Sequence, residues 1–327
     1  MRSDLGSLLA ELRLFAGVAE GELVEIADVL QPVELQRGEV LFRQGAEASG
    51  LHVVATGSVG VYSRLPGGGE VVLATLGVGE VIGELSLVDG GTRAATVRAL
   101  ERTTVFFLAR PDFDALVARK GPTAFAIRRR LAAIVCERLR RRYSALGRSL
   151  TDERPPLHEP PEPVAAVEEL LHAPAPAERY LARLPFFAGF ASLQLRELLD
   201  ACRTLIVPSR RGLLREGVRA DRAYVTLNGA VEEAIGRGVR RIRVRLAGPG
   251  SAAGLVGLVD GRPSPVTAGT RQRALLLALP RWTFDELFNG TTALSFAFLE
   301  AVERDLITAL RQAERPQVRL AATRGQQ

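Results

Sequence analysis

The stretch VIGELSLVDGGTRAATV, residues 81–97, places one glutamate and one arginine nine positions apart between two strand-like segments. A related stretch, AAGLVGLVDGRPSPVTA at 252–268, has leucine in place of Glu84 and serine in place of Arg93. The two stretches belong to a longer repeat, with an offset of 172 residues that drifts to 171. A repeat of this length indicates the duplication of a whole domain rather than a solenoid.

Each copy shows the same order of elements, which is a helix, many short strands and then helices. Residues 33–110 alternate short apolar, β-branched runs with glycines, a pattern typical of an antiparallel sandwich or barrel. Residues 112–146 predict a helix, a break at KGP, and a longer helix with one apolar stripe. We therefore expect a mainly β fold with flanking helices (α+β), built as two tandem antiparallel β-barrel or jelly-roll domains.

The domain boundaries follow from composition. We expect a first domain at 1–150, a proline-rich linker at 151–179, a second domain at 180–314 and a flexible tail at 315–327. Seven prolines between 151 and 180 favour a semi-extended spacer, with one helical turn at VEELL. The tail contains a proline followed by little apolar pattern, so we expect it to fray.

Composition narrows the class of protein. The chain has 327 residues, 47% of them hydrophobic and 24% charged, as in globular domains. It lacks a run of about 18 apolar residues and the signature of a signal peptide at its start. The two cysteines, Cys136 and Cys202, are too few for a disulfide framework or a cysteine metal site. We expect a cytoplasmic protein without a membrane span.

The positive charge has two interpretations. The net charge is +6, and nearly all of it is arginine, since Lys120 is the single lysine. Arginines cluster at 128–130 and at 138 and 140–142, within the predicted long helix. A solvated helix face is the simpler account, and contact with nucleic acid or a membrane surface is the alternative.

The chemistry of residues 83–97 suits a phosphate and a sugar. Gly83 permits an unusual turn, and the amides that open the following short apolar turn favour an anion. The Arg93 guanidinium matches phosphate oxygens, and the small Ala94 and Ala95 let a ligand approach the backbone. An ionised Glu84 accepts hydrogen bonds from hydroxyls. The pattern indicates a nucleotide, and an internal Glu84–Arg93 salt bridge is the structural alternative.

The segment GELSLVDGGTRAATV resembles the phosphate-binding cassette of cyclic-nucleotide-binding domains, with its Gly-Glu pair and its Arg-Ala-Ala-Thr-Val end. The resemblance implies that Glu84 takes the ribose 2′-hydroxyl and that Arg93, with the amides near Leu85 and Ala94, binds the cyclic phosphate. Ile82 departs from the family, many of whose members have an aromatic residue there. The ligand-binding residues implied are Gly83, Glu84, Leu85, Arg93, Ala94, Ala95 and Thr96.

The resemblance also separates the two copies. A threonine or serine after the arginine often accompanies cGMP in this family, and Ala94 offers no such hydroxyl, so we favour cAMP over cGMP. In the second copy Leu255 and Ser264 replace the two charged residues, and prolines flank Ser264. Burying a phosphate diester without a cation is unfavourable, so we predict that the second copy does not bind a cyclic nucleotide.

The function expected is that of a non-catalytic cyclic-nucleotide sensor that signals to a protein partner. Its tandem domains are similar to the regulatory subunits of cAMP-dependent protein kinase and to the sensor domain of bacterial cAMP receptor-type regulators. Nucleotide binding is expected to move the helix at 123–146 over the base, with Val135, Leu139 or Tyr143 as the capping residue. RRYS at 141–144 resembles a kinase substrate, so kinase inhibition is one form of this output.

Two other classes of function stay open at this stage. A nucleotide-regulated nucleic-acid binder would use the arginine helix. An enzyme is not expected, because His52, His158 and His172 are scattered and no metal spacing, nucleophile elbow or Walker loop is present. We expect no cofactor and no metal. A second copy of the chain is a candidate partner, as a homodimer.

Overall fold

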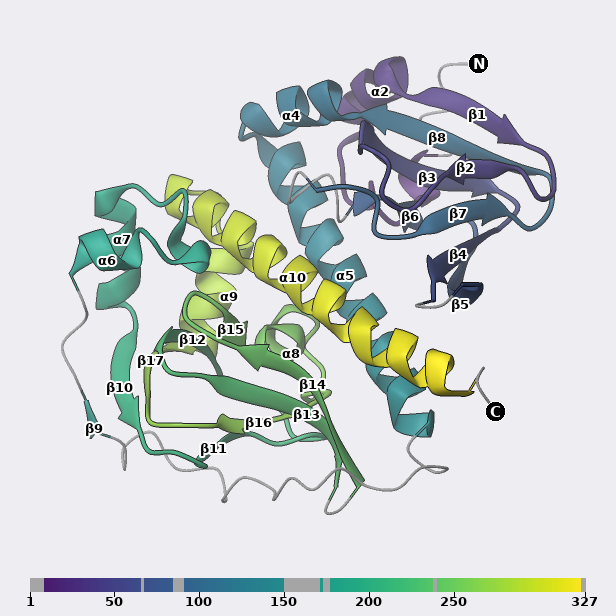
Figure 1. Ribbon diagram of the computed structural model, residues 1–327. Helices are drawn as coiled ribbons and strands as arrows, with labels where there is room; N and C mark the ends of the chain where they lie inside the picture. Colours follow the sequence, from purple (N-terminus) through teal and green to yellow (C-terminus); the bar gives the residue numbers. More distant parts are fainter. Residues whose placement is uncertain are drawn as a thin grey trace. The chain divides into compact units, whose positions relative to one another are not determined.

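The computed structural model describes residues 9–65, 68–84, 91–149, 171–172, 177–237 and 240–324. The chain divides into two compact units, the first made of residues 1–134 with 317–327 and the second of residues 135–316 (Figure 1). The boundary falls inside one helix, so the first unit holds the first copy of the repeat and the second unit begins within the helix that follows it.

The first copy is a sandwich of two antiparallel four-stranded sheets preceded by helix α2 (Glu20–Val29). The sheet orders are β1-β8-β3-β6 and β2-β7-β4-β5. Buried aliphatic residues from both sheets, among them Val54, Val59, Leu76 and Val105, form its core. The strands are β1 (Gln31–Leu35), β2 (Val40–Phe42), β3 (Gly50–Thr56), β4 (Val59–Arg64), β5 (Glu70–Leu76), β6 (Val81–Ile82), β7 (Thr96–Ala99) and β8 (Thr103–Ala109).

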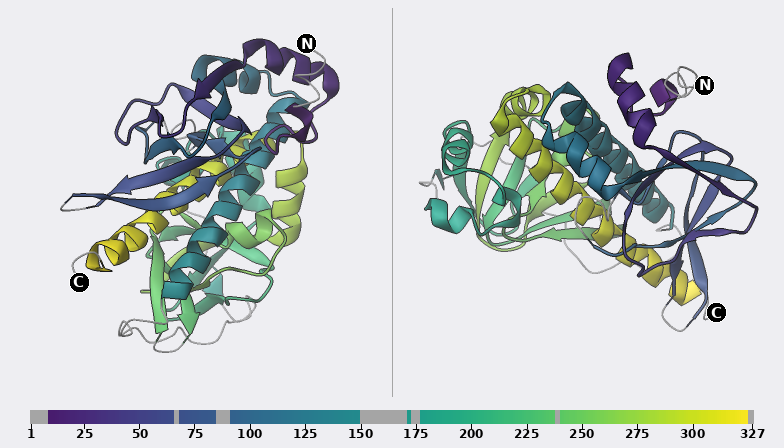
Figure 2. Two further views of the ribbon diagram at one scale, coloured as in Figure 1. Left: turned by 90° about the vertical axis from the view of Figure 1, so that its right-hand side faces the viewer. Right: turned by 90° about the horizontal axis from the view of Figure 1, so that it is seen from above.

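The second copy repeats this topology strand for strand, with sheet orders β10-β17-β12-β15 and β11-β16-β13-β14. Its strands are the teal and green arrows in Figure 2. One extra short strand, β9 (Leu171–His172), pairs with β10 at the edge. The strands are β10 (Arg203–Val207), β11 (Gly212–Leu214), β12 (Arg222–Asn228), β13 (Val231–Arg237), β14 (Arg240–Ala247), β15 (Ala252–Ala253), β16 (Thr267–Thr270) and β17 (Ala274–Pro280). The predicted tandem jelly-roll fold is confirmed, as paired open sheets rather than closed barrels.

The helices that flank the sandwiches also repeat. In the first copy α4 (Arg110–Ala118) is followed by α5 (Pro122–Ser149), and in the second α9 (Arg281–Asn289) is followed by α10 (Ala293–Arg324). The predicted break at KGP is confirmed, because Lys120 is left-handed with φ 48° and Pro122 opens α5. Shorter helices of the second unit are α6 (Glu178–Leu181), η2 (Pro185–Phe187), α7 (Ser192–Asp200) and α8 (Leu255–Val259).

The sequence predicts a tail at 315–327, and the structure continues α10 through Pro316 to Arg324. A proline inside a helix removes one hydrogen bond and costs about 3 kcal/mol. The neighbouring residues are mainly Ala, Arg, Gln, Glu and Leu, which favour helix and offset that cost.

The helical turn expected at VEELL lies outside the described residues. None of the helices in the described part has the length and apolar composition needed to cross a bilayer.

Candidate functional site

Strand β6 and the loop before β7 bring the predicted cassette residues of the first copy together. Gly83 follows β6 with a positive φ of 88°, a conformation that glycine adopts without strain. Its carbonyl accepts a long hydrogen bond of 3.5 Å from Nη1 of Arg93. A Cβ atom at position 83 would collide with the Arg93 guanidinium, so both the backbone and the packing require glycine here.

Arg93 is a buried cation. Its side chain lies over the Phe42 ring, with Cζ 4.2 Å from the ring centroid, and the residue is 3% exposed. Burial lowers the pKa of the guanidinium; the nearby Glu84 charge raises it and the Arg110 charge lowers it. Nε of Arg93 has no hydrogen-bond partner among the described residues. A buried cation with an unsatisfied donor favours an anionic ligand.

Glu84 accompanies this cation and is 1% exposed. Its charge acts on Arg93, so the two residues that are nine positions apart in sequence share one buried site. Proximity of this kind is required by both interpretations of the sequence, nucleotide binding and an internal salt bridge. The unsatisfied Nε of Arg93 and the cation–π contact with Phe42 favour the first.

The remaining predicted residues form the backbone frame of the site. The amide of Arg93 donates to the carbonyl of Ala46, and the amide of Gly45 donates to the carbonyl of Arg93, both at 2.9 Å. The hydroxyl of Thr96 accepts the Gln44 amide at 3.0 Å, which makes Thr96 a support of the loop rather than a free donor. Ala94 is half-buried and Ala95 is buried. Leu85 lies outside the described residues.

The sequence interpretation missed two aromatic neighbours and gave no role to His52. The His52 ring lies between Phe42 and Phe107, with centroid distances of 5.8 and 4.9 Å. Burial, and then the charge of Arg93, lower the pKa of His52 to about 3, so it is neutral at pH 7. The register of β3 against β6, which places His52 opposite Ile82, brings these rings to the cassette. The sequence alone does not give this strand register, so it did not indicate that these rings lie beside the cassette.

The second copy keeps the same backbone frame without the charges. Gly254 has a φ of 94°, Leu255 opens α8 at the position of Glu84, and Ser264 takes the position of Arg93. The amide of Gly217 donates to the Ser264 carbonyl at 2.9 Å, as Gly45 does to Arg93. The Ser264 hydroxyl donates to the Val266 carbonyl at 2.7 Å, so it is used within its own loop.

The interior of the second copy contains an ionic cluster. Arg245 on β14 lies 2.7 Å from Asp305 on α10 and 3.7 Å from Glu233 on β13, and all three are buried. Asp305 also accepts the Ala252 amide at 3.0 Å, and Nη1 of Arg245 donates to the Ala252 carbonyl at 2.7 Å. Burial raises the pKa of Glu233, while Arg245 lowers it. The repeat places Val61, Ala74 and Ile134 at these three positions of the first copy.

This cluster fills the second copy's counterpart of the cassette site. The cavity lined by Gly254, Leu255 and Ser264 retains only about 10 Å³, and Tyr143, Glu233 and Arg245 line it as well. A volume of this size holds no more than one water molecule. The structure places Tyr143, one of the three candidates for the residue that caps the base, in the second copy's cavity, and the identity of the capping residue stays a prediction. Val135 and Leu139, the other two candidates, also belong to the second unit.

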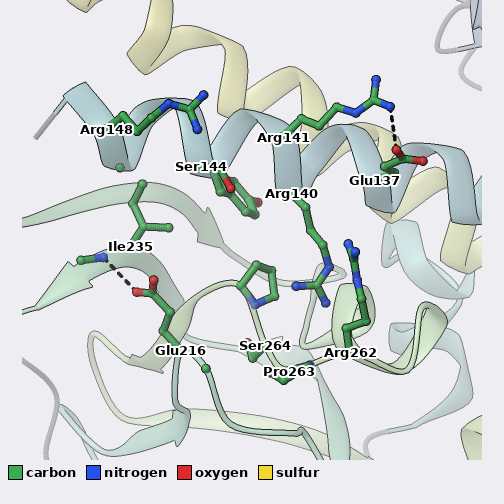
Figure 3. A pocket seen from close by; sticks show the side chains of 15 residues that line it. Glu137, Arg140, Arg141, Ser144, Arg148, Glu216, Ile235, Arg262, Pro263 and Ser264 are labelled. Atoms are coloured by element: carbon green, nitrogen blue, oxygen red, sulfur yellow. Dashed lines mark hydrogen bonds and ion pairs between the residues drawn. The ribbon is translucent and has the colours of Figure 1, made fainter.

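A wider groove of about 890 Å³ runs between the C-terminal half of α5 and the Arg262–Pro265 loop. Figure 3 shows Arg140 descending from α5 and Arg262 rising from the loop, with Pro263 and Ser264 beside them. Arg140 makes a bidentate ion pair with Asp260, at 2.5 and 2.8 Å, and Nε of Arg262 lies 3.3 Å from the same carboxylate. Arg141 pairs with Glu137 within the helix. The arginines of this helix thus have partners inside the protein.

Comparison with known proteins assigns both copies of the repeat to one domain family. The family model for the cyclic nucleotide-binding domain matches residues 32–120 and 207–291, one region in each copy. The Cyclic AMP receptor protein of Thermus thermophilus is 38% identical over 127 residues, which are 39% of this chain and 57% of that protein. The cAMP-dependent protein kinase regulatory subunit of Schizosaccharomyces pombe is 32% identical over 111 residues, 34% of this chain and 26% of that protein.

The curated relatives are matched over less than two thirds of their own length, so the chain resembles a part of each. Among solved structures, the regulatory domain of Toxoplasma gondii PKA with cAMP covers 89% of this chain and 93% of its own, at 20% identity and a TM-score of 0.34. The Thermus thermophilus Catabolite Activator Protein covers 42% of this chain and 62% of its own, at 35% identity and a TM-score of 0.37.

Proposed function

Because the chain belongs to the cyclic nucleotide-binding domain family, we propose that its first copy binds one cyclic mononucleotide, cAMP, and that the chain is a non-catalytic regulatory protein. The observation that carries this proposal is the buried guanidinium of Arg93, whose Nε has no hydrogen-bond partner among the described residues and which Gly83 and Phe42 hold in place. A phosphate diester would supply the missing acceptor and a negative charge in addition to that of Glu84.

Glu84 and the loop amides complete the proposed ligand shell. Glu84 takes the ribose 2′-hydroxyl, because an ionised carboxylate only accepts hydrogen bonds. The backbone from Arg93 to Ala95 lies beneath the phosphate, with small side chains that allow close approach. The preference for cAMP over cGMP rests on Ala94, which has no hydroxyl for the guanine amino group. Leu85 is the further proposed contact, through its amide.

The second copy is proposed not to bind a nucleotide. Ser264 supplies no charge at the position of Arg93, and the Arg245 cluster fills the space beside it. Desolvating a phosphate diester there would have no compensating cation, since Arg245 already faces two carboxylates. We therefore expect one nucleotide for each chain.

The output is proposed to be a protein contact in the cytoplasm, with a homodimer as one arrangement to test by sedimentation. The nucleic-acid alternative has less support, because a binding face needs arginines that can reach phosphates. Arg128 is buried, Arg140 is paired with Asp260, and Arg141 is paired with Glu137. The RRYS match lies inside helix α5 and is not in an extended segment.

Titration calorimetry of the full chain with cAMP and with cGMP tests the proposal, using Arg93→Ala as the informative variant. Truncating one partner of a buried charged contact typically costs about 2–5 kcal/mol, so the affinity should fall by about thirtyfold or more. Arg98→Ala is the matched control, because Arg98 lies on the adjoining strand β7, pairs with Glu70 and stacks on Tyr62. The control should bind within about threefold of the unaltered chain, since such a partly exposed pair contributes little.

The expected result is saturable binding with one site for each chain, tighter for cAMP than for cGMP. Absence of binding by either nucleotide would overturn the proposal. If the Arg93→Ala and Arg98→Ala variants bind the nucleotide with equal affinity, Arg93 is not the residue that binds the phosphate. A stoichiometry of two would show that the second copy binds as well.

A further inference from the structure

We infer that the second copy binds a segment of its own chain in place of a nucleotide: the C-terminal half of α5, with Tyr143 in the former nucleotide cavity. This goes beyond the proposed function, which concerns the first copy. The cavity is identified by its lining, because Gly254, Leu255 and Ser264 stand where Gly83, Glu84 and Arg93 stand in the first copy.

Tyr143 is the side chain that α5 contributes to this cavity. The residue is 5% exposed although it lies on a helix outside the sandwich, and burial raises the pKa of its phenol well above the ordinary value. Glu233 and Arg245 line the same cavity, so the aromatic ring lies beside the buried ion pair. An aromatic ring with a polar tip suits a mixed apolar and ionic cavity.

A second contact fixes the helix beside the cassette loop. The Arg140 guanidinium and the Asp260 carboxylate form two parallel hydrogen bonds, and their side chains are only 16% and 15% exposed. Asp260 lies at the end of α8, within the stretch 252–268 that corresponds to the cassette of the first copy. Residues 136, 139, 140, 143 and 146 share one face of α5, and Cys136, Leu139 and Leu146 are buried. The Arg140–Asp260 pair therefore joins this buried face of α5 to the loop that follows α8.

The far side of the cavity is closed by α10 through the Asp305–Arg245 pair. The cavity is thus enclosed by groups of the protein, and the remaining 10 Å³ leaves no room for a nucleotide. Since α5 is the direct continuation of the first copy, a change in the first copy that moves this helix would act on Tyr143 and Asp260. Nucleotide binding in the first copy would then act on the second copy directly, through α5.

Thermal unfolding of the full chain tests the occupancy of the cavity without any nucleotide. Tyr143→Ala should leave a ring-sized cavity and lower the midpoint of the second unit's transition by roughly 10 °C. Phenol added as the probe should bind in that cavity and restore part of the loss, as small aromatic molecules do in engineered apolar cavities. Tyr143→Phe keeps the ring and is the matched control, with no response to phenol. An unchanged midpoint in Tyr143→Ala, or an equal phenol response in both variants, would overturn the inference.

Charge reversal tests the second contact and does not depend on a cavity. Arg140→Asp should increase hydrogen exchange over 135–149 by tenfold or more, and adding Asp260→Arg should restore protection. If the double variant exchanges as fast as the single one, the ion pair does not hold the helix. With cAMP present, exchange over 252–260 should change in the unaltered chain but not in Arg140→Asp, while calorimetry reports nucleotide binding separately. Failure to bind cAMP would end the proposed function, and the phenol and reversal results would still decide this inference.

Discussion

Glu233 faces Arg245 across the ladder of β13 and β14, at the register position that Val61 and Ala74 occupy between β4 and β5. The carboxylate and guanidinium lie 3.7 Å apart, and Asp305 adds a shorter contact of 2.7 Å from α10. One cross-strand pair thus differs in character between two otherwise matching sandwiches. In the first copy the pair is apolar, whereas in the second it forms part of a buried ionic cluster that fills the site.

Removing the cation of this cluster should destabilise the second unit strongly. Arg245→Ala leaves Glu233 and Asp305 buried without their counter-charge, and breaking a buried pair in this way costs about 3–5 kcal/mol. Urea unfolding of the full chain measures the loss. Arg243→Ala, on the same strand with an exposed side chain, is the control and should stay within about 0.5 kcal/mol.

A variant that carries the first copy's residues, Glu233→Val with Arg245→Ala and Asp305→Ile, should recover much of that stability. Replacement of a buried ion cluster by apolar residues is often neutral or stabilising. A loss in Arg245→Ala no larger than that in Arg243→Ala would contradict the role given to the cluster.

Gly83→Ala should weaken cAMP binding by more than tenfold. The new methyl group would meet the Arg93 guanidinium and displace it, and φ at this position is positive. Gly38→Ala is the matched control, because Gly38 has a similar φ of 85° and open space around its Cβ position. Both variants should lose about 1–2 kcal/mol of stability from backbone strain. Calorimetry should find the affinity of the control within about twofold of the unaltered chain; equal losses in both variants would make strain, and not the guanidinium, the cause.

The stability of the first unit should fall as the pH drops below 6.5. The folded pKa of His52 is about 3 and its ordinary value is 6.5, so the unfolded state takes up the proton first. The free energy of unfolding then falls by about 1.4 kcal/mol for each pH unit between these two values, or about 2 kcal/mol between pH 7 and pH 5.

Urea unfolding of the full chain at pH 7 and pH 5 measures this loss, and His52→Phe should remove most of it. Arg93, whose charge faces the imidazole and lowers its pKa, contributes to the effect. Saturating cAMP should reduce the loss in the unaltered chain, because a phosphate beside Arg93 makes protonation of His52 less unfavourable. If the unaltered chain and the His52→Phe variant lose the same free energy of unfolding between pH 7 and pH 5, His52 is not the source of the pH dependence.

Glu84→Leu copies the second copy's Leu255 and should abolish discrimination between cAMP and 2′-deoxy-cAMP. A hydrogen bond to a charged acceptor contributes about 1.5–3 kcal/mol, so the unaltered chain should bind the deoxy ligand more than tenfold more weakly. In Glu84→Leu the two ligands should bind within about threefold of each other. Competition calorimetry measures the four affinities, and retained discrimination in the variant would assign the hydroxyl to another group.

Most of the fold could be predicted from local sequence patterns. The repeat, the glycine-separated short strands and the KGP break predicted two jelly-roll domains with flanking helices, because turn chemistry and periodicity act over a few residues. The sequence did not predict that α10 continues past Pro316, where helix-favouring neighbours outweigh a single proline. The site was predicted in part, since Gly83, Glu84 and Arg93 lie within one short stretch, whereas Phe42 and His52 reach it only through strand pairing.

The amino-acid sequence is enough to identify the copy that retains a cation for a phosphate, because Arg93 and Ser264 differ in charge whatever their surroundings. What fills the cavity of the other copy depends on how the chain folds. Glu233, Arg245, Asp305 and Tyr143 come from two strands and two helices, and nothing in their spacing indicates that they meet. The physical reason is that the energy of a buried charge depends on its neighbours in space, and those neighbours are set by sheet register and helix packing.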